Sequence, residues 1–207
     1  GATRNATVLL PLKSDGTIEV VASNNAGNWT LDISGYLTQP AGTWTYRYDT
    51  AGTRSAKISP DGTTTQFAYS SAPGLPMLLE QVTGTTKTFI IYGPGDQPVE
   101  QINPDGTTWW LHHDQLGSVR LATLSTTGAT ISSRTFNAYG TTKAQSGTQP
   151  LLGYNGQYHD TETGFLFLRA RYAEPLTGQF VTLDPLASVT RDPYGYAGGN
   201  PQTGVDP

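Results

Sequence analysis

The chain has 207 residues, a formal net charge of −4, and only 12 lysines and arginines spread along its length. Because phosphate binding needs clustered positive charge, we do not expect nucleic acid to be a partner. The absence of cysteine excludes disulfides, thiolate metal sites and a cysteine nucleophile.

The composition favours an ordered, turn-rich β protein. The 24 glycines and 14 prolines together make up 38 of the 207 residues. This share is above average but below the roughly 25–30% that marks aperiodic disordered chains. No apolar run approaches the roughly 18–20 residues that span a bilayer, so we expect no membrane span. No cofactor is implied.

Residues 1–40 form the first predicted segment. Three extended runs are separated by Asp15-Gly16 and by the sequence NNAGN at 24–28. Asp-Gly and Asn-rich turns accept the positive φ of hairpin turns. We expect a short β-rich segment similar to the end of a β-sandwich module.

The sequence TWTYRYD at 43–49 alternates in the manner of a half-buried strand. Trp44, Tyr46 and Tyr48 share one face, since side chains on a strand alternate between its two sides. We expect the aromatic rings to pack between strands and to serve as scaffold.

An internal repeat follows. The pentapeptide PDGTT occurs at 60–64 and again at 104–108, each time before an aromatic run. Proline presets φ at the first turn position and glycine takes the left-handed position, so each copy predicts a hairpin turn followed by a strand.

Three features between residues 109 and 160 could carry chemistry. Trp109 and Trp110 could stack on sugar rings if exposed. The HHD sequence at 112–114 is an unfavourable metal site, because neighbouring strand residues face opposite sides. His159 and Asp160 are predicted to lie in a turn.

The sequence GFLFLRARY at 164–172 has the period of a single strand. That reading places Leu166, Leu168, Ala170 and Tyr172 on one face. Arg169 and Arg171 would then share the opposite face, where they could support nearby acids.

The tail carries three Asp-Pro steps, at Asp184, Asp192 and Asp206. Proline restricts the preceding aspartate to extended backbone, which fixes the direction of each carboxylate. Two acids brought together could share a proton. Without further information, the favoured interpretation is that Asp184 and Asp206 each cap a turn that the proline makes rigid, and Asp192 is also expected to be a turn residue.

The run from LHHDQLGSVRLAT through GYNGQYHDTETGFLFLRARY to the terminal NPQTGVDP resembles the Rhs-repeat-associated core domain, with Gly117 at a turn. Upstream, YRYDTAGTRSAKISPDGTTTQFAYS resembles the tyrosine-aspartate (YD) repeats that precede this core. The resemblance covers roughly 44–207. It divides the chain into YD repeats at 41–110 and the core at 111–207, and it implies an all-β fold, a coiled antiparallel sheet forming part of a shell.

The resemblance also implies an activity. Rhs cores have two Asp-Pro motifs about 22 residues apart, as Asp184 and Asp206 are, and cleave themselves after the second. The two carboxylates would form a dyad like that of aspartic proteases. This sequence departs from the family at Ala187, where glycine is usual, and at Gln179, where arginine is usual. The chain stops at Pro207, before the expected scissile bond, so we expect a fragment of a longer chain.

The expected partner is a C-terminal toxin domain of the same parent chain, which the shell would enclose. Cell-surface or secretion machinery is a further expected partner, and the expected location is secreted or on the bacterial cell surface. The alternative is a non-enzymatic YD-repeat adhesion scaffold that binds glycans, with the Asp-Pro steps serving as turns.

Overall fold

The computed structural model describes residues 43–71, 74–184 and 187–206. These residues belong to one compact unit, Gly42–Pro207. The predicted β-rich segment at 1–40 lies outside the described residues.

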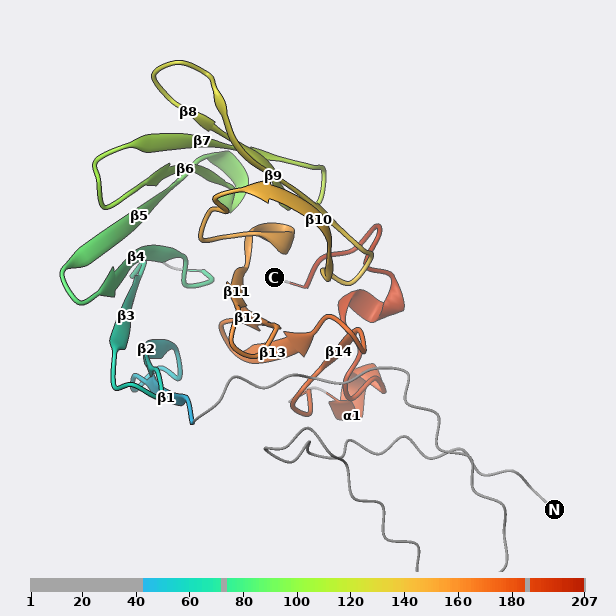
Figure 1. Ribbon diagram of the computed structural model, residues 1–207. Coiled ribbons are helices and arrows are strands. Elements are labelled where there is room, and N and C mark those ends of the chain that lie inside the picture. Colours follow the sequence, from blue (N-terminus) through green and yellow to red (C-terminus); the bar gives the residue numbers. More distant parts are fainter. Residues whose placement is uncertain (1–42, 72–73, 185–186, 207) are drawn as a thin grey trace, which may run out of the picture. The chain divides into compact units, whose positions relative to one another are not determined.

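Most of the unit is one sheet of ten strands that follow one another in chain order, each antiparallel to the next. Figure 1 shows them succeeding one another along a curved sheet, from β1 in blue to β10 in orange. The strands are β1 (Thr45–Tyr48), β2 (Arg54–Ile58), β3 (Thr64–Tyr69), β4 (Leu78–Thr83), β5 (Thr86–Tyr92), β6 (Pro98–Ile102), β7 (Thr108–His113), β8 (Val119–Leu124), β9 (Thr130–Phe136) and β10 (Thr142–Gly147). The prediction of an all-β fold with a coiled antiparallel repeat sheet is confirmed.

The PDGTT repeat folds as predicted. Its first copy turns between β2 and β3 and its second between β6 and β7. In each turn the aspartate accepts a backbone N–H two residues on, from Thr63 to Asp61 and from Thr107 to Asp105. The glycine between them has φ of 85° in the first copy and 80° in the second, which other residues rarely adopt.

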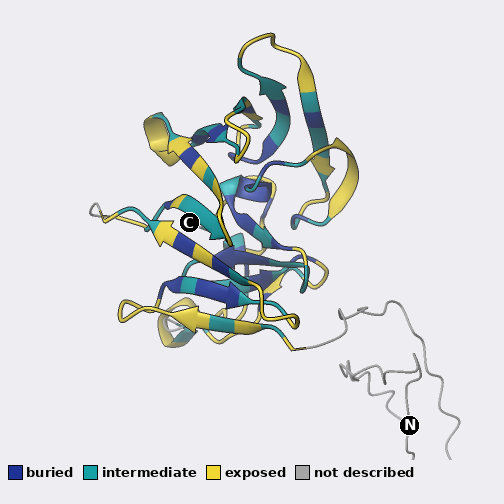
Figure 2. Ribbon diagram, turned by 60° about the vertical axis from the view of Figure 1, so that its left-hand side comes forward, coloured by how far each residue is buried: buried dark blue, intermediate teal, exposed yellow. Residues whose placement is uncertain are grey.

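The two faces of the sheet differ in burial. Phe67, Ile90, Leu111 and Ala122 are buried on what we call the inner face. Buried and exposed positions alternate along several strands (Figure 2). Register shifts interrupt six of the nine strand pairings within the sheet, and such irregularities bend and twist strands.

A second sheet follows in the order β11 (Tyr158–Asp160), β12 (Phe165–Leu168), β13 (Arg171–Glu174) and β14 (Gln179–Phe180). The tail then contains one short helix, α1 (Ala187–Thr190). Single 3-10 turns lie at η1 (Pro94–Asp96), η2 (Tyr154–Gly156) and η3 (Ala197–Gly199).

Two local predictions are wrong. The GFLFLRARY sequence is not one strand: β12 ends at Leu168, the chain turns at Arg169 and Ala170, and Leu168 pairs with Arg171 in β13. His159 and Asp160 lie in β11 rather than in a turn, and the turn comes after them, where the Gly164 N–H donates to the Asp160 carbonyl at 2.7 Å.

The second sheet packs against the inner face of the first. One apolar cluster joins Phe67, Leu78 and Ile90 of the first sheet to Tyr158 and Phe167 of the second, together with Leu152. Another holds the tail, through Tyr154, Leu166, Leu168, Ala173, Phe180 and Tyr196. The core therefore lies between the curved ten-stranded sheet, which we call the wall, and the four-stranded sheet that fills the concave side of the wall.

The first sheet continues across the predicted division at residues 110 and 111, which falls within β7. The division therefore remains a sequence-based prediction about family segments. Among the described residues, no helix is long and apolar enough to cross a membrane.

Candidate functional site

Asp184 and Asp206 lie on the tail that follows β14. The Asp184 backbone N–H donates to the Pro193 carbonyl at 2.8 Å, and its carbonyl accepts the Ala187 N–H at 3.0 Å. Asp206 Oδ2 accepts the Ala197 N–H at 3.2 Å. Backbone contacts therefore define the position of each acid within the tail.

One arginine brings the two acids together. Arg171 Nη1 lies 3.5 Å from Asp184 Oδ2, and its Nη2 lies 3.7 Å from Asp206 Oδ1. The guanidinium carbon lies 3.5 Å from the ring centre of Phe180, the last residue of β14. An aromatic platform thus carries a cation that faces both carboxylates.

The ion pairs of this cluster are long and its side chains are partly exposed. Distances of 3.5 and 3.7 Å are longer than the roughly 2.7–2.9 Å of direct charge-assisted hydrogen bonds. The side chains keep 16–25% of their surface accessible. Water can therefore reach two carboxylates that contact one cation.

Arg169 does not join this cluster. Its Nε donates to the Pro76 carbonyl at 2.8 Å and its Nη1 donates to Gln157 Oε1 at 2.7 Å. The prediction that Arg169 and Arg171 share a face is wrong, because the β12–β13 turn intervenes and Arg169 adopts a φ of 62° there.

Asp192 behaves as a turn residue. Its Oδ1 accepts the Gly195 N–H at 2.8 Å. This is the capping geometry of aspartate in a turn. It is the role expected for the Asp-Pro step that lies between the two paired ones.

The histidines and tryptophans of β7 point to separate environments. His112 Nε2 lies 3.0 Å from Thr123 Oγ1, whereas His113 Nε2 bonds the Pro98 carbonyl, and a register shift separates the two. Trp109 packs beside the apolar cluster of Leu111, Val119 and Ala122, while Trp110 is 44% exposed. Within the described residues, no three His, Cys, Asp or Glu side chains could hold a metal ion.

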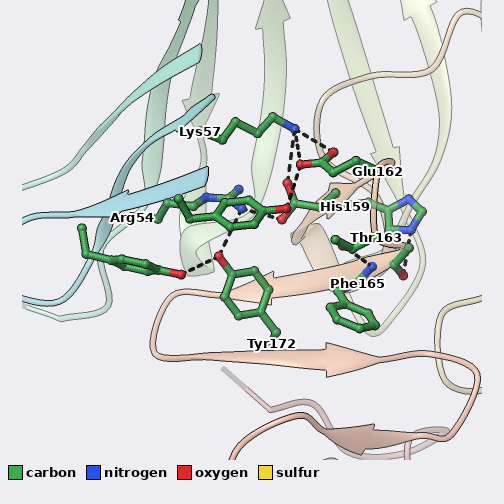
Figure 3. Close-up of polar contacts among 11 residues, drawn as sticks. Arg54, Lys57, His159, Glu162, Thr163, Phe165 and Tyr172 are labelled. Atoms are coloured by element: carbon green, nitrogen blue, oxygen red, sulfur yellow. Dashed lines mark hydrogen bonds and ion pairs between the residues drawn. The ribbon is translucent and has the colours of Figure 1, made fainter. Parts of the chain in front are cut away.

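A second charged cluster, which the sequence did not reveal, joins the two sheets (Figure 3). Arg54 of β2 donates through Nη1 to Asp160 Oδ2 of β11 at 2.5 Å, and both side chains have no exposed surface. Five aromatic rings have centres within 4.3–5.8 Å of the guanidinium carbon, those of Tyr46, Phe67, Tyr158, Phe167 and Tyr172.

Lys57 extends this cluster. Its Nζ lies 3.3 Å from Asp160 Oδ1 and 3.0 Å from Glu162 Oε2. Burial alone would raise the pKa of Glu162, but hydrogen bonding by its backbone N–H and the charge of Lys57 outweigh this and hold that pKa below its usual value. Burial raises the pKa of Asp160, and the charge of Arg54 opposes that rise.

The local sequence pattern could not predict this cluster, because Arg54 and Asp160 are 106 residues apart and the sequence around Asp160 is typical of a turn. A buried ion pair often adds little net stability compared with well-packed apolar residues, but removal of one partner is costly. We interpret it as the contact that sets the position of the second sheet on the first.

Comparison with known proteins agrees with this architecture. A family model described as the teneurin YD-shell matches residues 19–196. The chain is 31% identical over 174 residues to the tRNA3(Ser)-specific nuclease WapA of Bacillus spizizenii, which covers 79% of this chain and 7% of the nuclease. It is 41% identical over 64 residues to the toxin protein Tse5 of Pseudomonas aeruginosa, covering 30% of this chain and 5% of the toxin.

The fold also matches solved structures. The crystal structure of TcdB2-TccC3-Cdc42 superposes with a TM-score of 0.60 at 20% identity, over 79% of this chain and 9% of that chain. A Photorhabdus luminescens Tc holotoxin pore superposes with a TM-score of 0.57 at 20% identity, over 96% of this chain and 10% of that chain. The chain spans well under a tenth of the length of the first curated relatives it matches.

Proposed function

Because the chain belongs to the teneurin YD-shell family and is an Rhs/YD-repeat protein, we propose that it forms the closing part of a β shell that encloses and presents a C-terminal toxin. The toxin would be a domain of the same parent chain, and the parent would be secreted or displayed on a bacterial cell surface. The names of two relatives, a nuclease and a toxin, support this proposal.

The arrangement of the two sheets supports a closing role. The wall continues strand by strand from β1 to β10, and the chain then leaves it and folds the second sheet against the inner face. A wall alone would leave that face open at this end. The second sheet and tail therefore act as the plug of the shell, with Asp184 and Asp206 at its end.

In the same proposal, the plug cuts its own chain. The observation that carries this step is that Arg171 lies within 4 Å of carboxylates from both Asp-Pro motifs, 22 residues apart. If both aspartates were merely turn caps, nothing would require one cation to face both. The shared cation supports a dyad, a pair of carboxylates that hold one proton between them when they approach closely.

The proposed reaction is hydrolysis of a peptide bond shortly after Asp206. The ionised aspartate takes a proton from water, whose oxygen attacks the scissile carbonyl, while the protonated aspartate donates to the carbonyl oxygen. Collapse of the tetrahedral intermediate breaks the C–N bond: the aspartate that took a proton from water gives it to the departing nitrogen, and the other aspartate takes its proton back from the hydroxyl of the intermediate as the carboxyl product forms. In this proposal Arg171 offsets the repulsion between the carboxylates and stabilises the negative charge that develops on the oxygen.

The departures from the family pattern are compatible with this role. Ala187 contributes a backbone N–H to the Asp184 carbonyl, a contact that needs no glycine. Gln179 is exposed and pairs with Glu174 in β13 and β14, so its side chain is not part of the Arg171 contact. The cation that faces the acids comes from β13.

The test is the intact mass of the parent protein, in which the chain continues beyond Pro207. We expect wild type to be cut shortly after Asp206, and Asp184→Asn and Asp206→Asn to remain intact. Asp192→Asn is the matched control, because this aspartate also precedes a proline but caps a turn; it should be cut like wild type.

Cleavage in either dyad variant, or its loss in the control, would contradict the dyad. A folded wild-type parent that stays intact would favour the non-enzymatic scaffold.

A further inference from the structure

Tyr196 is the buried anchor of the loop that carries Asp206. Only 2% of its surface is exposed, whereas Gly198, Gly199 and Asn200, close behind it, are exposed. Its ring packs on Phe180 at 5.7 Å between centres and on Tyr154 at 6.4 Å. Tyr196 and the buried Pro201 therefore hold the loop between Tyr196 and Asp206 to the core.

The Tyr196 hydroxyl ends a chain of buried hydrogen bonds. Asn155 Nδ2 donates to it at 2.8 Å. Asn155 in turn exchanges two bonds with Ser118: its backbone N–H donates to Ser118 Oγ at 2.9 Å, and that hydroxyl donates to Asn155 Oδ1 at 3.0 Å. Ser118 and Asn155 are 1% and 9% exposed.

These three residues come from three parts of the fold. Ser118 closes the turn before β8 in the wall, Asn155 lies in η2, and Tyr196 immediately precedes η3 in the tail. The wall and η2 are also joined by the backbone, where the Val119 N–H donates to the Gly153 carbonyl at 2.9 Å. The hydrogen-bond chain thus connects the wall sheet to the loop that bears Asp206.

A hydrogen bond from the residue after Tyr196 reaches Asp206. The N–H of the next residue, Ala197, donates to Asp206 Oδ2 at 3.2 Å. Burial raises the pKa of the Tyr196 hydroxyl, and the hydrogen bond from Asn155 acts in the opposite direction. Phe180, on which Tyr196 packs, also lies beneath the guanidinium of Arg171.

We propose that Tyr196, Asn155 and Ser118 are positioning residues for self-cleavage, which hold Asp206 in register with Asp184 and make that register depend on the completed wall. This inference rests on the proposed self-cleavage. The three residues act through Asp206 and Arg171, and none of them touches the bond to be cut.

The competing explanation is that Tyr196 only fills the core. Removal of the hydroxyl distinguishes the two explanations, because Tyr196→Phe keeps the ring and its packing but removes the acceptor for Asn155. Asn155 itself has a φ of 49°, so glycine is the replacement that removes its side chain without straining the backbone. Ser118→Ala breaks the chain at the wall.

The experiment follows the first-order rate of self-cleavage of the parent protein, refolded from denaturant, across a range of pH. We expect Tyr196→Phe to cleave about tenfold more slowly than wild type, as the loss of one positioning hydrogen bond implies. Ser118→Ala and Asn155→Gly should slow cleavage in the same direction. Displacement of Asp206 from its register with Asp184 should also change the pH–rate profile, which a loss of packing alone would leave as in wild type.

Tyr158→Phe is the matched control. Tyr158 is also buried and aromatic-packed, but it lies in the cluster around Arg54. This variant should lower the unfolding midpoint and leave the rate and its pH profile unchanged in the folded protein.

Wild-type rates and profiles in folded Tyr196→Phe and Ser118→Ala would overturn the positioning role while leaving the dyad intact. Should Tyr196→Phe fail to fold, the profile of Ser118→Ala decides. A wild-type parent that does not cleave, or an Asp206→Asn parent that does, would overturn the dyad and with it this inference.

Discussion

The charged clusters around Arg54 and around Arg171 both pair an arginine with carboxylate, and they differ in almost every physical respect. Around Arg54, both members of the closest pair are fully buried, the N–O distance is 2.5 Å, and five aromatic rings close the surroundings. Around Arg171, the contacts are 3.5 and 3.7 Å, one ring lies beneath the guanidinium, and the side chains remain partly accessible.

The difference indicates a structural role for the Arg54 cluster and a reactive role for the Arg171 cluster. A buried, tightly bonded pair cannot exchange protons with solvent without a large cost, so it serves to fix the second sheet on the first. Looser, accessible carboxylates can change protonation and admit water. The same residue types thus support opposite roles, decided by burial and distance.

The largest effect is expected where the buried cluster loses its cation. Arg54→Met leaves Asp160 buried with only Lys57 as a charged partner, and we expect the free energy of unfolding to fall by about 3–5 kcal/mol. Urea denaturation of the 207-residue chain measures this. Lys87→Met is the control, because Lys87 is 56% exposed in its pair with Glu80; it should cost at most about 1 kcal/mol.

A double replacement sharpens this prediction. Replacing a buried ion pair by apolar residues of similar size is often neutral, so Arg54→Met with Asp160→Leu should recover much of the loss. If the single variant were as stable as the Lys87 control, the buried cluster would not be the contact that fixes the second sheet.

The same substitution in the accessible cluster should cost much less stability. Arg171→Met removes two long ion pairs and a contact with Phe180, and we expect a loss of about 1 kcal/mol. Self-cleavage of the parent should nevertheless be lost, because the two acids no longer share a cation. Urea denaturation and intact mass together check this, and a loss as large as that of Arg54→Met would erase the distinction between the clusters.

The smallest expected effect is a dependence of the free energy of unfolding on pH, through His159 beside the buried cluster. Burial lowers the pKa of His159, although its hydrogen bond to the Gly164 carbonyl at 3.1 Å acts the other way. The unfolded chain therefore binds a proton more readily, near pH 6.5. Stability should be fully present above that pH and fall as the pH drops towards the folded pKa, by no more than about 1.4 kcal/mol per pH unit.

His159→Gln should flatten this part of the stability curve, measured as the urea midpoint between pH 7.5 and 5. An unchanged slope in the variant would assign the pH dependence to other groups.

The sequence predicted best where structure is local. The PDGTT turns and the alternating TWTYRYD strand follow from turn chemistry and a period of two, which neighbouring residues determine. The β12–β13 hairpin was missed because Arg169 takes a positive φ without a glycine, asparagine or proline to mark the turn. Its contacts with Pro76 and Gln157, 93 and 12 residues away, hold it there.

The site was only partly predictable, because it too depends on contacts between residues that are distant in the sequence. The spacing of Asp184 and Asp206 suggested a pair through the family resemblance, and the structure places Arg171 within 4 Å of both. The pairing of Arg54 with Asp160 and the path from Ser118 to Tyr196 depend on how the second sheet docks on the first. Strand periodicity and turn signals carry no information about that docking.

The most direct test of the account measures cleavage and stability in the same samples. Intact mass and the unfolding midpoint are recorded for parent proteins carrying no change, Asp184→Asn or Arg54→Met. We expect Asp184→Asn to stay uncut with a midpoint close to that of wild type, whereas Arg54→Met should lower the midpoint clearly. An Asp184→Asn protein that is cut like wild type, or one that is uncut only because it no longer folds, would contradict it.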